Sequence, residues 1–156
     1  MSFKGGSRLE KPNVTASTII SFAEKLEEDS AKFYDELAKR YVEGKEIFLS
    51  FSEESKKNKT LITRTYQETI SDALEACFIE GLNLSEYLTE IRLEEDTSYS
   101  DALKMAMELE EKASKFYSDA AEKSESLLAT IPSAFRKVAK RRNNRKSKLK
   151  SLLEGI

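Results

Sequence analysis

The sequence predicts an all-α fold: an antiparallel four-helix bundle of two helical hairpins, joined by one long crossover that contains a short helix. Only two prolines and five glycines occur in 156 residues, so long uninterrupted helices are possible. Apolar residues recur at helical spacing along four long segments. The stretches LEEDSAKFY, from Leu26, and LEEKASKFY, from Leu109, are identical at six of nine positions, which indicates that the two hairpins are related.

The first predicted hairpin consists of two helices joined by a short connection. The first helix begins near Thr15 or Ser17, which are good N-cap residue types, and ends near Val42. Gly44 is the expected stop. The second helix begins at about Lys45 and ends in the low seventies. Because the connection is short, the two helices are expected to be antiparallel neighbours.

The crossover and the second hairpin follow. The segment DALEACFIEGLNLSEYLTEIRLEEDTS has a different pattern, and we expect a short helix to begin near Ser85 within it. The third long helix begins near Ser98 or Ser100, and Ser98 with Asp101 resembles a capping box. Pro132 suits the first turn of the last helix.

Composition limits the class of protein. We expect one domain, residues 15–156, preceded by a flexible arm, residues 1–14. The net charge of −2 argues against a chain built wholly for nucleic acid, and no run approaches the length of a membrane span. The single cysteine, Cys77, excludes an intramolecular disulfide and indicates a cytoplasmic protein. The chain has no histidine, which excludes a Ser–His–Asp triad and every His-ligated metal site.

At one central level, each of the four apolar stripes contains at least one polar or charged residue. The interrupting positions are Glu27 and Ser30, Ser55 and Asn58, Glu110 and Ala113, and Arg142 and Arg145. Four coincident interruptions predict one buried polar layer. Its two glutamates and two arginines have charges that sum to zero, and a guanidinium can bridge two carboxylates through forked hydrogen bonds.

These residues resemble a known family. The LE…FY pattern occurs twice, the second helix of each hairpin begins with an F-x-x-[FV]-[AS] pattern, and the N-terminal segment reads KGGSRLEKPN. The chain from about Thr15 to Leu153 is similar in these features to rubrerythrin-like proteins of the ferritin-like superfamily. The resemblance implies a ferritin-like bundle, often dimeric, in which a di-metal carboxylate site reduces peroxide or oxidises iron.

The ligand set that the resemblance implies is mostly lost. Each first helix of a hairpin would supply a glutamate seven residues before a tyrosine, and these positions are Glu27 before Tyr34 and Glu110 before Tyr117. Each second helix would supply Glu-x-x-His, and these positions are Ser55 and Asn58, then Arg142 and Arg145. Arginine has no lone pair to offer and stays protonated. We therefore expect a vestigial site with no metal, no cofactor and no conventional di-iron oxidoreductase activity.

Three functions remain open at this point. The favoured hypothesis is a metal-free protein with a structural or interaction role, whose former di-iron site is now a Glu/Arg ion-pair network. The second is a remodelled di-metal carboxylate oxidoreductase, of peroxidase or ferroxidase type, that uses Glu27 and Glu110 with Tyr34, Tyr117 or Asp29. The third is binding of an anion or nucleic acid by the last helix, which has nine Lys or Arg and no acid between Arg136 and Lys150.

The expected partners follow from the same features. A solvated helix face explains the basic residues better than nucleic acid does, because no aromatic residue is interleaved with them. A homodimer is expected, partly from the resemblance and partly from the apolar crossover. An unknown protein partner is a further hypothesis, and a membrane is not expected. The crossover residues concerned are Phe78, Ile79, Leu82, Leu84, Tyr87 and Leu88.

Overall fold

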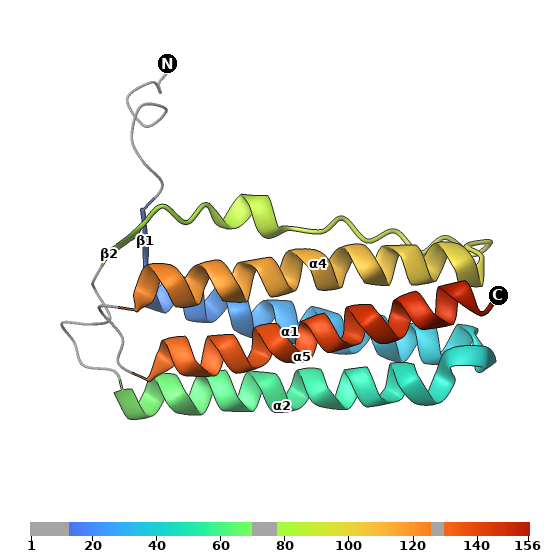
Figure 1. Ribbon diagram of the computed structural model, residues 1–156, viewed down its shortest axis with the longest axis horizontal. Helices are drawn as coiled ribbons and strands as arrows, with labels where there is room; N and C mark the ends of the chain where they lie inside the picture. Colours follow the sequence, from blue (N-terminus) through green and yellow to red (C-terminus); the bar gives the residue numbers. More distant parts are fainter. Residues whose placement is uncertain (1–12, 70–77, 126–129) are drawn as a thin grey trace, which may run out of the picture.

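The computed structural model describes residues 13–69, 78–125 and 130–156. In these ranges the long elements are α1 (Ala16–Arg40), α2 (Lys45–Thr69), α4 (Tyr99–Ser124) and α5 (Ile131–Glu154). Helix α1 packs mainly against α2, and α4 packs mainly against α5. The four helices lie side by side along one long axis, with the crossover running beside α4 (Figure 1). The predicted all-α class and the helical bundle are confirmed.

The helix starts agree with their capping residues. Thr15 is the N-cap of α1, and its Oγ1 accepts from the Thr18 amide at 3.1 Å. Ser98 is the N-cap of α4, and its Oγ accepts from the Asp101 amide at 3.0 Å. Pro132 stands in the first turn of α5, where its missing N–H costs no helical hydrogen bond.

The end of α1 differs from the prediction. The helix ends at Arg40, two residues before Val42, and Val42–Gly44 form a 3₁₀ turn that leads directly into α2. Gly44 is therefore not a left-handed helix stop. A Cβ built on Gly44 would lie 2.7 Å from the Phe48 ring and 2.9 Å from the Tyr99 hydroxyl, so close packing explains the glycine. The predicted end of α2 in the low seventies lies outside the described residues.

The last two residues of the predicted arm, Asn13 and Val14, belong to a strand. Residues 1–12 lie outside the described residues, but Asn13–Thr15 form strand β1, which pairs antiparallel with β2 (Phe78–Glu80). Val14 is the partner of Ile79, which is 1% exposed. The local sequence pattern does not reveal this pairing, because the two strands are far apart in the chain. The pairing connects the start of α1 to the crossover.

The crossover carries the predicted short helix as a single 3₁₀ turn, Leu84–Tyr87, with Asn83 as N-cap. Gly81 precedes it with a φ of 83°, a left-handed conformation that favours glycine. The Tyr87 hydroxyl donates to Asp119 Oδ2 on α4 at 2.6 Å. At the other end, the Tyr41 hydroxyl donates to the Thr97 carbonyl at 2.5 Å. These contacts fix the crossover along the bundle.

The core is divided into two apolar clusters. One cluster surrounds Ile19, Ile62 and Phe135, and the other surrounds Leu37, Phe48 and Leu149. The four buried charged residues, Glu27, Glu110, Arg142 and Arg145, lie at the level between the two clusters along α1, α4 and α5. The fold thus places a polar layer in the middle of an otherwise apolar interior.

Candidate functional site

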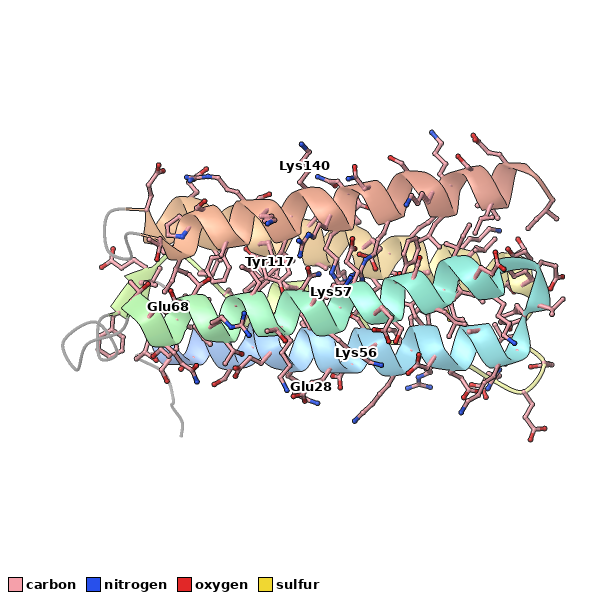
Figure 2. The ribbon with its side chains drawn as sticks, turned by 90° about the horizontal axis from the view of Figure 1, so that it is seen from below. Glu28, Lys56, Lys57, Glu68, Tyr117 and Lys140 are labelled. Carbon is pink, nitrogen blue, oxygen red and sulfur yellow. The ribbon has the colours of Figure 1, made fainter. Side chains whose placement is uncertain are left out.

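The central layer contains the side chains that the sequence predicted. All four helices contribute, and each side chain is at most 1% exposed: Glu27 and Ser30 from α1, Ser55 and Asn58 from α2, Glu110 from α4, and Arg142 and Arg145 from α5. Tyr34 and Tyr117 are fully buried beside them. Tyr117 points between the helices, whereas Lys57 and Lys140 point outward (Figure 2).

Arg142 lies between the two buried glutamates. Its Nη1 donates to both carboxylate oxygens of Glu110, at 3.0 and 2.9 Å. Its Nη2 donates to Glu27 Oε2 at 2.9 Å and to Ser30 Oγ at 2.9 Å. One guanidinium therefore bridges two carboxylates from α1 and α4, as the charge balance of the layer predicted.

The two tyrosines exchange hydrogen bonds between the halves of the repeat. The Tyr34 hydroxyl on α1 donates to Glu110 Oε2 on α4 at 2.5 Å. The Tyr117 hydroxyl on α4 donates to Glu27 Oε2 on α1 at 2.5 Å. The Glu and the Tyr that lie seven residues apart on one helix thus bind the Tyr and the Glu of the other helix. These two hydrogen bonds fix the level of α1 against that of α4.

Arg145 binds a glutamate that the sequence analysis missed. Its Nε donates to Glu54 Oε1 at 2.7 Å, and its Nη1 donates to Ser55 Oγ at 2.9 Å and more weakly to Glu110 Oε2 at 3.5 Å. The guanidinium also lies over the Phe51 ring, 5.5 Å from its centroid. The sequence signal that could have revealed Glu54 is its place next to Ser55, at the edge of the same helix face.

Asn58 completes the layer on the α2 side. Its Nδ2 donates to Glu27 Oε1 at 3.2 Å, and its Oδ1 accepts from Arg141 Nη1 at 2.7 Å. Arg141 is a further residue that the sequence analysis did not place here. From its half-buried position on α5, Arg141 can reach the amide oxygen of Asn58. Asn58 therefore bridges the outer Arg141 and the buried Glu27 carboxylate.

Burial and charge together set the protonation states. Desolvation, followed by the adjacent Glu110 carboxylate, raises the pKa of Tyr34 well above its ordinary value. Desolvation and Glu27 do the same to the pKa of Tyr117. For Arg142, desolvation acts to lower the pKa, but Glu110 and Glu27 outweigh it and the pKa is raised. Both tyrosines therefore stay neutral donors and Arg142 stays a cation.

The raised tyrosine pKa values predict a loss of stability in alkali. Above about pH 10 the unfolded tyrosines release protons and the buried ones do not, so the unfolded state is favoured as pH rises toward the folded pKa. Each tyrosine adds a slope of about 1.4 kcal/mol per pH unit. Urea unfolding between pH 10 and 11.5 measures how steeply the free energy of unfolding falls with pH. This fall should be shallower than in wild type by about that amount in Tyr34→Phe and in Tyr117→Phe.

The comparison below pH 9 is the internal control, because the slopes of wild type and variants should coincide there. Equal slopes above pH 10 in wild type and both variants would show that these hydroxyls titrate freely and are not buried.

The layer does not suit a metal ion. Every oxygen of Glu27 and Glu110 accepts at least one hydrogen bond, and a guanidinium occupies the space between the two carboxylates. Among the described residues, no group of three or more His, Cys, Asp or Glu has a geometry that could hold a metal ion. Asp29 does not join the layer, since its carboxylate pairs with Lys25 at the surface, 3.1 Å away.

The basic residues of α5 are largely engaged within the chain. Arg142 and Arg145 are buried, and Arg141 donates to Asn58. On the outer faces, Arg136 pairs with Glu125 at 3.1 Å and Lys146 pairs with Glu111 at 3.7 Å. More than half of the nine basic residues thus have partners in the bundle, which weakens the argument for a nucleic-acid surface.

No helix within the described ranges combines the length and the apolar character that crossing a membrane requires. Comparison of the chain with protein-family models, with curated proteins and with solved structures found no match in any of the three.

Proposed function

We propose that the chain is a metal-independent, rubrerythrin-like protein of the ferritin-like fold, with a structural or interaction role. An ion-pair network takes the place that a di-metal centre occupies in that family. The observation that carries the proposal is the position of Arg142, whose two terminal nitrogens donate to Glu110 and Glu27 at 2.9 Å. Such a cation competes directly with a metal ion for the same two carboxylates.

The charges of the layer support this proposal. Glu27 and Glu110 carry two negative charges, and Arg142 and Arg145 carry two positive ones, all at most 1% exposed. A divalent ion added to this neutral set would bury uncompensated charge, which is strongly unfavourable in a low dielectric. These four charges therefore balance without an added ion, and the role of the network is to hold the four helices at one level.

A remodelled oxidoreductase is the second candidate, and one observation favours it. A cavity of about 380 Å³ between α1 and α2 is lined by Glu27 and Ser55, together with Lys32 and Lys59. The cavity borders the layer at Glu27 and Ser55, so an ion would have to enter the layer from that side. A metal ion would still have to displace Arg142 from Glu27.

The two candidates differ in metal stoichiometry. Untagged protein is dialysed anaerobically against excess Fe²⁺ or Mn²⁺ and then freed of unbound metal, and its metal content is measured. We expect well under 0.1 ion per chain, because every oxygen of Glu27 and Glu110 already accepts a hydrogen bond. One or two ions per chain, lost in Glu27→Gln, would overturn the proposal in favour of the oxidoreductase.

The homodimer remains a prediction, and the structure narrows the surface that could form it. Ile79, Leu82 and Tyr87 are buried within the chain, whereas Phe78 and Leu88 are 65% and 61% exposed. An interface through the crossover would therefore depend on Phe78 and Leu88. Light scattering across a broad concentration range should give a dimer mass that Phe78→Ser reduces, and a monomer throughout would refute the prediction.

A further inference from the structure

The side of the bundle that α2 and α5 form carries a dense group of cations. Residues 55–67 of α2 and 133–153 of α5 contain no acidic residue. The hydrogen bond from Arg141 to Asn58 shows that these two segments lie at the same level. Five cations therefore lie within about two helical turns of one another along the bundle axis. They form the basic patch: Lys57 and Arg64 on α2, and Lys137, Lys140 and Arg141 on α5.

Contacts and helical spacing place the basic patch on one outer side. Arg141 lines the cavity between α2 and α5, and Lys137 stands one turn away on the same helix face. Lys57 is three residues from Glu54, which lines the same cavity, and Arg64 is seven residues further along that face. In the described part of the chain, no acidic side chain pairs with any member of the patch. Like charges this close repel one another, so an anionic surface that binds them relieves the repulsion.

The crossover has the opposite charge. Residues 78–98 contain six acidic residues, all of them exposed, and one basic residue, Arg92, which pairs with Glu90 at 2.6 Å. Within the described ranges, none of the other five carboxylates pairs with a cation. The crossover is thus an acidic strip, whose acidic residues are Glu80, Glu86, Glu90, Glu94, Glu95 and Asp96.

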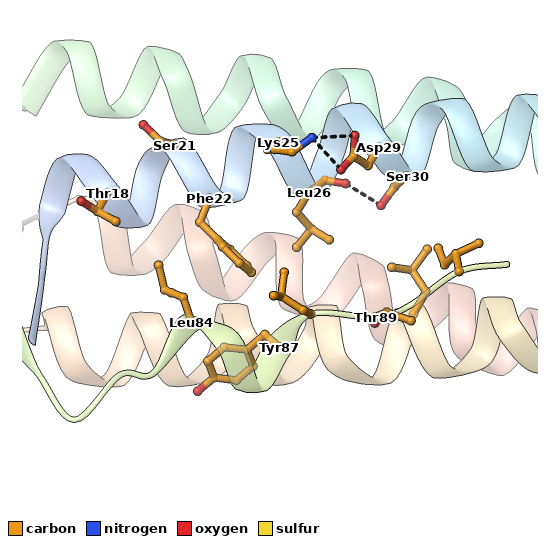
Figure 3. Close-up of a pocket in the computed structure, with 13 residues that line it drawn as sticks. Thr18, Ser21, Phe22, Lys25, Leu26, Asp29, Ser30, Leu84, Tyr87 and Thr89 are labelled. Carbon is orange, nitrogen blue, oxygen red and sulfur yellow. Dashed lines mark hydrogen bonds and ion pairs between the residues drawn. The ribbon is translucent and has the colours of Figure 1, made fainter. Parts of the chain in front are cut away.

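The acidic strip and the basic patch lie on opposite sides of the bundle. The crossover covers the groove between α1 and α4, since Leu84 points toward α1 across a cavity of about 380 Å³ (Figure 3) and Tyr87 binds Asp119 of α4 at 2.6 Å. The basic patch lies on the other two helices. With the bundle between them, the two surfaces cannot pair within one molecule, and both follow its long axis (Figure 1).

We propose that the basic patch of one copy of the chain binds the acidic crossover of a second copy. Charge complementarity between two surfaces of the same molecule identifies this occupant. Because the two surfaces are different and face away from each other, the contact is heterologous, and its repetition gives rings or open chains. The inference rests on the interaction role proposed above but not on the metal content of the central layer, so each can fail without the other.

A nucleic acid is a poorer occupant of the basic patch. It would find no aromatic side chain to stack on along α5, because Phe135, the one aromatic residue of that helix, is fully buried. It would also leave the acidic crossover uncompensated in a chain whose net charge is −2. A second copy satisfies both surfaces.

Sedimentation velocity of the full chain at about 0.1 M and about 1 M NaCl tests the contact, because this change shortens the screening length from about 10 Å to about 3 Å. We expect the mass at low salt to grow with protein concentration beyond that of a dimer. Association should weaken at least roughly tenfold at high salt. A dimer through Phe78 and Leu88 would instead persist at high salt, and such a dimer without further growth at low salt would overturn the inference.

Two charge reversals identify the surfaces. One variant reverses the patch with Lys57→Glu, Lys137→Glu and Lys140→Glu, and the other reverses the crossover with Glu86→Lys, Glu95→Lys and Asp96→Lys. Each variant alone should lose the salt-sensitive association, because its two surfaces then have the same sign. An equimolar mixture should regain it, because the first variant keeps the native crossover and the second keeps the native patch.

A control separates this contact from an effect of net charge. Lys32→Glu, Lys39→Glu and Lys56→Glu give the same net charge as the reversed patch, but Lys32 and Lys56 line the separate cavity between α1 and α2. This variant should associate with itself as wild type does, and thermal unfolding confirms that each variant is folded. Loss of association in the control, or no association in the mixture, would overturn the inference. Wild type that binds a DNA duplex but not itself would do the same and assign the patch to nucleic acid.

Discussion

Replacing Arg142 by alanine is expected to lower the free energy of unfolding by about 3–5 kcal/mol, the cost of breaking a buried ion pair from one side. Arg142 is fully buried and serves Glu27, Glu110 and Ser30 at once. Its removal leaves two carboxylates in a low dielectric without their shared cation. Urea unfolding at pH 7 measures the loss.

Two variants calibrate this result. Arg145→Ala should cost less than Arg142→Ala, because its main partner, Glu54, has a side chain that is 34% exposed and can turn to water. Arg136→Ala removes an exposed pair with Glu125, whose side chains are 52% and 65% exposed, and should cost about 0–1 kcal/mol. If Arg142→Ala loses no more than Arg136→Ala, the layer is hydrated and our account of it is wrong.

The opposite change should be tolerated. When a whole buried network is replaced by apolar residues of similar volume, its desolvation costs vanish with it, and stability is unchanged or rises by about 1–4 kcal/mol. The structure shows that the tyrosine hydroxyls and the Asn58 amide must be removed too, because they donate to the same carboxylates. The variant is therefore Glu27→Leu, Glu110→Leu, Arg142→Met and Arg145→Met with Tyr34→Phe, Tyr117→Phe and Asn58→Leu.

Restoring the family's ligand pattern is expected to turn a protein that binds no metal into one that binds two ions per chain. The variant combines Ser55→Glu, Asn58→His, Arg142→Glu and Arg145→His, which sets a Glu-x-x-His pair on α2 and on α5 opposite Glu27 and Glu110. Four carboxylates then balance two divalent cations. Without metal the variant should be much less stable than wild type, because the four carboxylates repel one another.

Thermal unfolding with and without Mn²⁺ checks this expectation. At a free concentration one hundred times the dissociation constant, each bound ion adds about 2.7 kcal/mol of stability. The matched control carries Gln in place of the two new Glu residues and should show little stabilisation. If the restored variant gains no stability and retains no ions, the two positions on α2 and the two on α5 do not face a common centre, and the resemblance to rubrerythrin-like proteins loses its main support.

The sequence by itself determined the helices and the level of the polar layer. Helical periodicity is a local property, and capping residues such as Thr15, Ser98 and Pro132 act within one turn. The Glu-to-Tyr spacing of seven residues is repeated in both hairpins, which predicted that the two glutamates lie at matching heights. Burial of Glu27, Glu110, Arg142 and Arg145 followed from their positions on the apolar stripes.

Only the tertiary structure decided which partner each side chain takes. Arg142 reaches Glu27 across 115 residues, and Tyr34 reaches Glu110 across 76. The engagement of Glu54 and Arg141, the pairing of β1 with β2 and the cavity under the crossover are likewise not contained in any local pattern. The physical reason is that these contacts depend on how each helix is rotated and shifted against its neighbours, and the packing of the whole bundle sets that geometry.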